Sequence, residues 1–346
     1  MGLFKNNTTY FGLDIGSTAI RFVELKAGKD KPVLVNYGQI AMPVGLASSD
    51  AVGDRDKVAA LIRQLLKDKK VTEKNVVAGL ASNKIFAAVI TTPKLDNAQL
   101  AKAIRFQAEQ YIPMAIDQVK LDFAVVDRSQ DGKNLEVLLV AAPITVVTKY
   151  AEIIEKAGLE PLALEANAIA VSRALVQAKG LAVVVVDLSS TDSDITIISG
   201  QTPRLMRSVP VGGQTFVKAV AQELGLDEIQ ALQFTTKFGL TQTKLEGQVY
   251  KAIKPSLDSL VGEIQKSVQF FTSRYPGQKL EKLVITGGTS ALPELAAYLA
   301  TASGLPVEFG NAWSGVAYPA GLQDELANLS RDYAAAIGLA ERSYQS

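Results

Sequence analysis

One short phrase occurs twice in this chain, and the two copies lie half a chain length apart. The first begins Gly12-Leu13-Asp14-Ile15-Gly16-Ser17-Thr18, and the second begins Val186-Asp187-Leu188-Ser189-Ser190-Thr191-Asp192. Their leading aspartates are separated by 173 positions (187 − 14) in a chain of 346 residues. Each copy is an apolar, β-rich run, an aspartate, a tight turn of small hydroxyl residues and a second β-rich run, which predicts a β-hairpin. The sequence therefore predicts two copies of one α/β lobe.

The two turns are also candidate phosphate sites. A tight turn leaves backbone N–H groups unpaired, and such groups form a concave site for anions. Two turns that face each other across a cleft would bind a polyphosphate, with Asp14, Asp187 and Asp194 binding its Mg²⁺ through water. The turn Gly16-Ser17-Thr18 is the strongest candidate, and the alternative is an ordinary hairpin turn in each place.

Composition removes several kinds of site. The chain has no cysteine and no histidine, which excludes disulfides, thiolate nucleophiles, histidine-based triads and Cys/His zinc sites. Any metal must then be bound by oxygen ligands, which favours Mg²⁺. The formal net charge of +1 gives no argument for a nucleic-acid partner. The apolar runs are shorter than the ~20 residues of a membrane helix, and Met1–Asn7 lacks the apolar part of a signal peptide, so we expect a cytoplasmic protein.

Other residues around the two turns are weaker candidates. Arg21 lies on the strand that leaves the first turn, where a cation would meet a terminal phosphate; a solvated strand arginine is an equal alternative. Arg21 stands an odd number of residues after Asp14, so we expect a bulge if both side chains point the same way. In the second turn, Ser189 and Ser190 stand where glycines would let a phosphate approach most closely, which predicts weaker binding.

Two pairs of glycines complete the candidate set. Gly287-Gly288 ends a buried strand and precedes a helix, which would let a base or ribose lie against the backbone. Gly212-Gly213 stands at another helix start, where Thr215 is alternatively only an N-cap. Four Gly/Asp turns at strand ends of two similar lobes predict a nucleotide cleft between the lobes.

Periodicity of apolar residues predicts the order of elements. Strands expected at 10–14, 20–26 and 33–42, a helix at 55–67 and a strand at 76–81 form the first half of a mixed α/β unit. A β-α-β-β-α-β order over about 84–164 predicts a small subdomain. The first pattern restarts at Leu181, so we expect packed lobes rather than domains joined by a linker.

These motifs make the chain resemble the actin-like ATPase superfamily and, within it, the PilM family of type IV pilus assembly proteins. Gly12–Ser17 resembles the first phosphate motif, Asp187–Asp194 the second, and Leu283–Ser290 the adenosine motif. The segments that are more specific to PilM are 109–113 (EQYIP), 119–123 (VKLDF), 157–161 (AGLEP), 211–213 (VGG) and 336–342 (AIGLAER).

The resemblance implies a four-part α/β fold of the actin-like ATPase type, with two duplicated lobes and the alternative subdomain of FtsA and PilM. Its parts would be 1–83 with 165–180 and 331–346 (subdomain 1A), 84–164 (1C), 181–215 with 282–330 (2A) and 216–281 (2B). ATP and Mg²⁺ would lie in the cleft, and hydrolysis would be slow or absent, with no catalytic residue. The residues implied for ATP are Gly16, Ser17, Thr18, Arg21, Ser189, Ser190, Gly212, Gly213, Gly287, Gly288 and Ser290, and those for Mg²⁺ are Asp14, Asp187 and Asp194.

The resemblance also implies a partner. PilM proteins dock the N-terminal cytoplasmic peptide of the membrane protein PilN in a groove between 1A and 1C, and through it join PilO, PilP and the assembly motors. The protein would then be peripheral to the inner membrane through its partner. Leu232 and Thr235 replace a family Glu and Lys that bind ribose and adenine, which predicts reduced nucleotide affinity because hydrogen bonds are lost.

Two other functions have the same fold. A small-metabolite kinase needs a base near the γ-phosphate, and Glu165 and Asn167 are the options nearby. A filament-forming protein of the FtsA or MreB kind is the second alternative. FtsA ends in an amphipathic membrane helix, whereas this chain stops at Ser346 just past its last expected helix. We therefore favour a scaffold that is recruited by a membrane partner.

Overall fold

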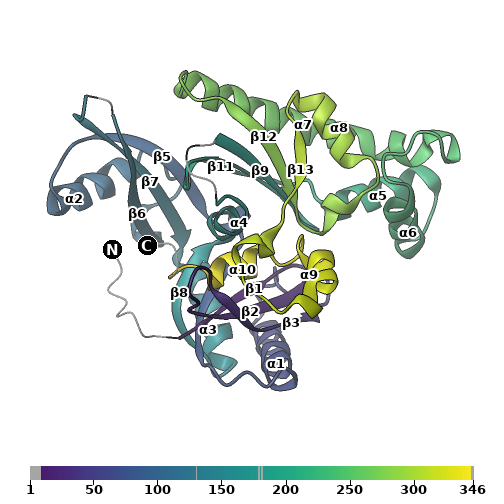
Figure 1. The fold of residues 1–346 in the computed structure, drawn as a ribbon, viewed down its shortest axis with the longest axis horizontal. Coiled ribbons are helices and arrows are strands. Elements are labelled where there is room, and N and C mark those ends of the chain that lie inside the picture. The colour runs from purple at the N-terminus through teal and green to yellow at the C-terminus, as the bar shows by residue number, and fades with distance from the viewer. Residues whose placement is uncertain (1–8, 130, 178–179, 181, 344–346) are drawn as a thin grey trace. The chain divides into compact units, whose positions relative to one another are not determined.

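The computed structural model describes residues 9–129, 131–177, 180 and 182–343 (Figure 1). The expectations for Met1–Asn7, for Leu181 and for the chain end at Ser346 lie outside these residues. Contacts divide the chain into two compact units. Unit 1 consists of Met1–Lys84, Ala142–Leu175 and Asn311–Ser346, and unit 2 of Ile85–Ala141 and Val176–Gly310.

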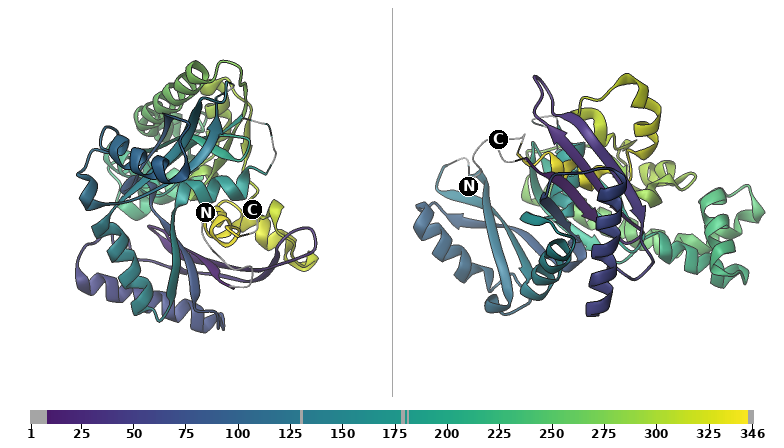
Figure 2. Two further views of the ribbon diagram at one scale, coloured as in Figure 1. Left: turned by 90° about the vertical axis from the view of Figure 1, so that its left-hand side faces the viewer. Right: turned by 90° about the horizontal axis from the view of Figure 1, so that it is seen from below.

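Unit 1 is built on a five-stranded sheet with the order β3-β2-β1-β4-β8. The first three strands form an antiparallel meander, and β4 and β8 extend the sheet in parallel from β1. Helix α1 contacts β3 and runs beside the sheet (Figure 2). The strands are β1 (Phe11–Ile15), β2 (Ala19–Lys26), β3 (Val33–Ala41), β4 (Asn75–Leu80) and β8 (Glu160–Ala166); the helices are α1 (Val52–Asp68), α3 (Ile144–Lys156), α4 (Asn167–Leu175), α9 (Gln323–Leu329) and α10 (Ala334–Ala340).

The sequence of β1 explains why it occupies the centre of this sheet. All five of its residues are buried, as expected for a strand covered on both faces. Gly12 lets α10 approach closely, because a Cβ there would overlap the backbone oxygen of Ala336 and the backbone nitrogen of Ala340. The aspartate that follows in β1 is therefore held in a rigid, dry setting.

Unit 2 contains a second five-stranded sheet, with the order β11-β10-β9-β12-β13. Its first three strands are again antiparallel, and β12 and β13 are again parallel to β9. The strands are β9 (Ala182–Leu188), β10 (Ser193–Ser199), β11 (Thr202–Val209), β12 (Leu280–Thr286) and β13 (Val307–Phe309); the helices are α5 (Gly213–Leu224), α6 (Glu228–Phe238), α7 (Gln248–Arg274) and α8 (Leu295–Ser303).

The two large sheets share one strand order and one pattern of strand directions. Strands β1, β2, β3, β4 and β8 of unit 1 correspond in turn to β9, β10, β11, β12 and β13 of unit 2. The duplication that the repeated phrase predicts is confirmed, and each phrase is the hairpin between the first two strands of its sheet.

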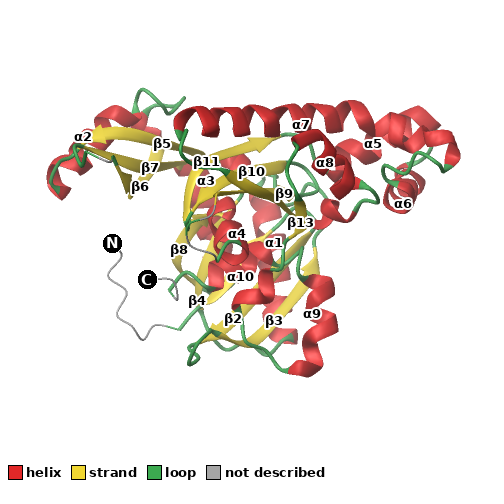
Figure 3. Cartoon of the chain, turned by 45° about the horizontal axis from the view of Figure 1, so that its top comes forward, coloured by secondary structure: helices red, strands yellow, loops and turns green. Residues whose placement is uncertain are grey.

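Unit 2 also carries a small three-stranded sheet with the order β5-β7-β6, covered by helix α2 (Figure 3). Its elements are β5 (Phe86–Pro93), α2 (Asn97–Ala108), β6 (Val119–Arg128) and β7 (Asn134–Pro143). The subdomain expected over 84–164 also included α3 and β8. In the structure α3 contacts α1 and β8 pairs with β4, so both belong to unit 1. The boundaries of the four subdomains stay a prediction.

None of the helices in the described part of the chain is both long and apolar enough to span a membrane.

Candidate functional site

The first candidate turn connects β1 to β2. Gly16 donates its backbone N–H to the carbonyl of Ala19 at 3.0 Å, which closes the turn. A Cβ on Gly16 would lie 2.9 Å from that same oxygen, so the tight turn requires glycine. Ser17 is half-buried and Thr18 is exposed.

Asp14 and Arg21 lie directly opposite each other in this hairpin. Opposed residues of an antiparallel pair point to the same face, whatever the number of residues between them. The expected bulge is therefore absent from this register, and Arg21 reaches the face of Asp14 in regular pairing. Arg21 also donates to Gln39 at 3.2 Å, pairs with Asp332 at 3.5 Å and lies over the ring of Tyr333.

Asn167 is a residue of this site that sequence reasoning named only as a possible base. It lies where β8 meets α4 and donates its amide to the Asp14 carboxylate at 3.2 Å. Its own amide oxygen is buried without a hydrogen-bond partner among the described residues. That oxygen packs on Gly79, where a Cβ would overlap it. A glycine within a strand often marks a place where another group approaches the backbone closely. Gly79 is therefore the feature of the sequence that could have indicated this contact.

Asp14 is a buried carboxyl group with two neighbours that favour its ionised form, Arg21 and Asn167. Burial raises the pKa of its carboxyl above the ordinary value, although the charge of Arg21 and the amide of Asn167 pull the pKa down. A divalent cation would favour the ionised carboxylate. No group of three or more acidic side chains forms a metal site among the described residues. Mg²⁺ would therefore keep several water ligands, which this ion commonly does.

The second hairpin has a different pair of residues in the same register. Asp187 and Asp194 lie directly opposite each other, so Asp194 takes the place that Arg21 has in unit 1. Opposed residues of an antiparallel pair point to the same face, so both carboxylates lie on one face of this sheet, as a shared metal site requires. That both bind Mg²⁺ stays a prediction.

The second turn is packed against the start of α5. The carbonyls of Ser189 and Ser190 accept hydrogen bonds from the backbone N–H groups of Gly213 and Gln214 at 3.0 and 2.8 Å. A Cβ on Gly212 would lie 2.6 Å from the backbone nitrogen of Asp192. The close contact between this turn and the start of α5 therefore requires a small residue at Gly212, whether or not a phosphate binds there.

The adenosine-like motif lies next to Asp187 within unit 2. Gly287 has a φ of +82° and is buried, and a Cβ there would overlap the carboxylate of Asp187. Gly288 is exposed, as a residue that faces a ligand would be. Ser290 is fully buried and donates its hydroxyl to the carbonyl of Gly287 at 2.6 Å, so its visible role is to shape the turn. Thr289, which was not predicted, donates to the carbonyl of Ser189 at 2.9 Å.

Helix α6 carries Leu232 and Thr235, the two positions that are expected to depart from the family pattern. The Leu232 side chain is 54% exposed, whereas Thr235 is 2% exposed and its hydroxyl is buried without a partner among the described residues. Neither side chain presents a charged group to a nucleoside.

Neither of the two possible kinase bases is available. The Glu165 carboxylate is bound by the Arg173 guanidinium at 2.6 and 2.9 Å, and both side chains are largely buried. Asn167 has an amide, which does not act as a base near neutral pH. The part of unit 1 around Asp14 thus lacks a ready general base among these two residues.

A family model for the type IV pilus assembly protein PilM matches residues 12–344. This chain belongs to the PilM family. The solved structure of a PilM–PilN type IV pilus biogenesis complex is similar to it at 27% identity, with a TM-score of 0.85 over 98% of this chain and 99% of that one. The family expected from the sequence motifs is confirmed.

Two more distant structures show the fold alone. The ethanolamine utilization protein EutJ from Carboxydothermus hydrogenoformans is 15% identical, with a TM-score of 0.55 over 98% of this chain and 91% of that one. MreB5 of Spiroplasma citri, solved bound to AMPPNP, is 10% identical, with a TM-score of 0.56 over 96% and 95%. The expected actin-like fold is confirmed.

Proposed function

We propose that this chain is a scaffold of type IV pilus assembly that binds Mg-ATP and docks the N-terminal cytoplasmic peptide of a PilN-like membrane protein. The observation that carries the proposal is the TM-score of 0.85 to a PilM–PilN complex over 98% of the chain. Through that peptide the protein associates with the inner membrane, and contacts with PilO, PilP and the assembly motors follow from the same role.

The nucleotide part of the proposal rests on features of each unit taken separately. Unit 1 supplies the turn at Gly16, the Arg21 cation and the buried Asp14. Unit 2 supplies the opposed pair Asp187 and Asp194 and the Gly287-Gly288 turn beside them. Mg²⁺ bound to the aspartates would neutralise phosphate charge. Because Glu165 and Asn167 offer no base, we propose that ATP is held and hydrolysed slowly or not at all.

We expect Asp14→Asn to weaken Mg-ATP binding at least about tenfold, because one charged contact to the metal shell is lost. Trp313 is the only tryptophan of the chain and contacts Tyr333, whose ring lies under Arg21. Tryptophan fluorescence titrated with Mg-ATP therefore reports on the surroundings of Asp14 and Arg21 in unit 1. Asp117→Asn, at an exposed position in the short turn before β6, is the matched control and should bind as the parent does. Undiminished binding by Asp14→Asn would remove Asp14 from the site.

The docking part of the proposal is supported by the surface of the small sheet. Three large apolar side chains around the end of α2 are exposed: Phe106 (71%), Tyr111 (45%) and Met114 (40%). Helix α2 ends at Ala108, so Tyr111 and Met114 lie beyond its last turn. These three side chains lie within nine residues of one another in the sequence, and exposed apolar side chains that form a patch mark interaction sites.

A synthetic peptide with the sequence of the cognate PilN N-terminus should bind the protein and slow hydrogen exchange at 97–112. We expect Phe106→Ala to weaken this binding about tenfold, as for a central aromatic contact. The matched control is Ile229→Ala, which removes an equally exposed apolar side chain (72%) from α6. A scrambled peptide that binds as well, or equal losses in both variants, would contradict the proposed docking.

A further inference from the structure

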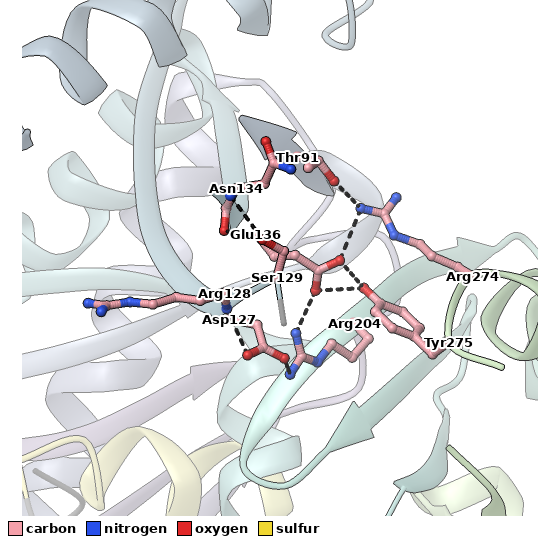
Figure 4. Close-up of polar contacts among 9 residues, drawn as sticks. All are labelled: Thr91, Asp127, Arg128, Ser129, Asn134, Glu136, Arg204, Arg274 and Tyr275. Carbon is pink, nitrogen blue, oxygen red and sulfur yellow. Dashed lines mark hydrogen bonds and ion pairs between the residues drawn. The ribbon is translucent and has the colours of Figure 1, made fainter. Parts of the chain in front are cut away.

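A dense group of charged side chains connects the small sheet to the rest of unit 2 (Figure 4). We call Glu136, Asp127, Arg204, Arg274 and Tyr275 the Glu136 cluster. Glu136 of β7 accepts from Arg204 of β11 at 2.7 Å and from the Tyr275 hydroxyl at 3.0 and 3.1 Å. Asp127 of β6 accepts from the second terminal nitrogen of Arg204 at 2.6 Å.

Further contacts tie the cluster to α7 and to β5. Arg274, the last residue of α7, pairs with Glu136 at 3.5 Å and donates to the Thr91 hydroxyl of β5 at 3.2 Å. Both arginine guanidinium groups lie within 6 Å of the Tyr275 ring centre, at 5.5 and 5.7 Å. Two cations thus face two carboxylates around one aromatic ring, which is a balanced set of charges.

Arg204 of the large sheet and Glu136 of the small sheet are the most buried charged residues of the cluster. The exposed fractions of the Arg204 and Glu136 side chains are 6% and 16%. Removing one partner of such a pair leaves the other charge buried and unpaired, which is costly. The contact is therefore strong only while every partner is in place.

The small sheet otherwise has a core of its own. Its buried apolar residues on the face toward α2, such as Ile90, Ile104 and Leu139, form one cluster, and those of the large sheet of unit 2 form another; Leu138, which is buried on the other face of β7, belongs to neither. The two clusters have no residue in common. Polar contacts between separately folded parts resemble those of interfaces that open and close.

The path of the chain shows why the position of the small sheet in unit 2 depends on contacts such as the Glu136 cluster. Residues 85–141 continue at both ends into unit 1, at Lys84 and at Ala142. No peptide bond joins them directly to residues 176–310, so their place in unit 2 depends on non-covalent contacts, which include the Glu136 cluster and the approach of β5 to β11.

We propose that the Glu136 cluster is a releasable contact, which fixes the small sheet on the large sheet of unit 2. When the cluster opens, the small sheet moves as a rigid body while its own core stays intact. Because the surface around Phe106 lies on this sheet, the opening also changes the affinity for the partner peptide; this second clause rests on the proposed function.

The test is a distance measurement within unit 2 of the full-length protein. Since the chain has no cysteine, Lys120→Cys on β6 and Lys251→Cys on α7 give two unique sites for spin labels, both at exposed positions. We expect one narrow distance distribution in this parent, and a broadened one with a mean shifted by several ångströms in Glu136→Gln. Glu263→Gln is the matched control, because Glu263 also accepts from two cations, Arg207 and Lys266, outside the cluster.

The outcomes separate the possibilities. An unchanged distribution in Glu136→Gln overturns the proposal, as does broadening that accompanies loss of hydrogen-exchange protection in α2, which would mean local unfolding. If Glu136→Gln fails to fold, Arg274→Gln removes the 3.5 Å pair with Glu136 and the charge beside Thr91 and Tyr275, but keeps the 2.7 Å Arg204–Glu136 pair, so it should broaden the distribution less; no broadening there overturns the proposal. None of these measurements uses the partner peptide, so the failure of the docking proposal is detected separately by peptide binding to the parent protein.

Discussion

Replacing Gly338 with alanine should lower the free energy of unfolding by about 3 kcal/mol or more, the upper range of overpacking costs. Gly338 lies in α10 where this helix crosses α4, and a Cβ there would overlap the backbone oxygen of Ala170. Backbone atoms of a buried helix do not move aside as a flexible side chain does. The two helices would have to separate, and the carbonyl of Gly338 would move away from Arg173, which donates to it at 2.6 Å.

Urea denaturation followed by circular dichroism measures this loss. The matched control is Gly262→Ala within α7, where a Cβ would meet no atom within 4 Å. That variant should be more stable, by up to about 1 kcal/mol, because alanine is the better helix former. Equal effects of the two substitutions would show that α10 and α4 are not in the contact described.

Replacing Glu341 with glutamine should stabilise the protein at pH 8 by about 1–3 kcal/mol and have little effect near pH 4.5. Glu341 follows α10 and is 3% exposed. Burial raises the pKa of its carboxyl to about 7, against an opposing effect of Arg173. Since the folded state prefers the protonated acid, wild-type stability falls as the pH rises from about 4.5 to 7, and glutamine removes this dependence.

Urea titrations at several pH values test this expectation. Glu263→Gln is the control of opposite sign, because hydrogen bonds from Lys266 and Arg207 lower the pKa of Glu263. Its ionised form is the favoured one in the folded state, so that variant should lose a little stability at neutral pH. A Glu341→Gln variant with the wild-type pH profile would mean that Glu341 is ionised without penalty in the folded protein.

Several features of the fold were predictable because they depend on local pattern. The repeated phrase around Asp14 and Asp187 predicted two hairpins, and both appear between the first two strands of a large sheet. Apolar periodicity also placed α1 within a few residues of its bounds. Local periodicity did not show that β8 pairs with β4, since strand partners far apart in sequence leave no local pattern.

The candidate site was predictable to a similar degree. The motif positions identified Asp14, Gly16 and Gly287 by residue type and spacing. The odd number of positions from Asp14 to Arg21 led to the prediction of a bulge, which was wrong. Two residues of a hairpin point to the same face when they are opposite each other in the strand pairing, whatever their separation along the chain. Asn167 was not predicted as a partner of Asp14 because the two residues are 153 positions apart in the sequence. They meet only because the strands β1 and β8 belong to the same sheet.

The sequence by itself determined the family, the duplicated lobes and the residue types at the two turns, because short motifs and apolar periods are local properties of a chain. Only the tertiary structure decided which groups meet: the Asp14–Asn167 contact, the Arg173–Glu165 pair that removes a possible base, and the Glu136 cluster. Each of these joins residues from different elements, and its energy depends on burial and on distances that close packing sets.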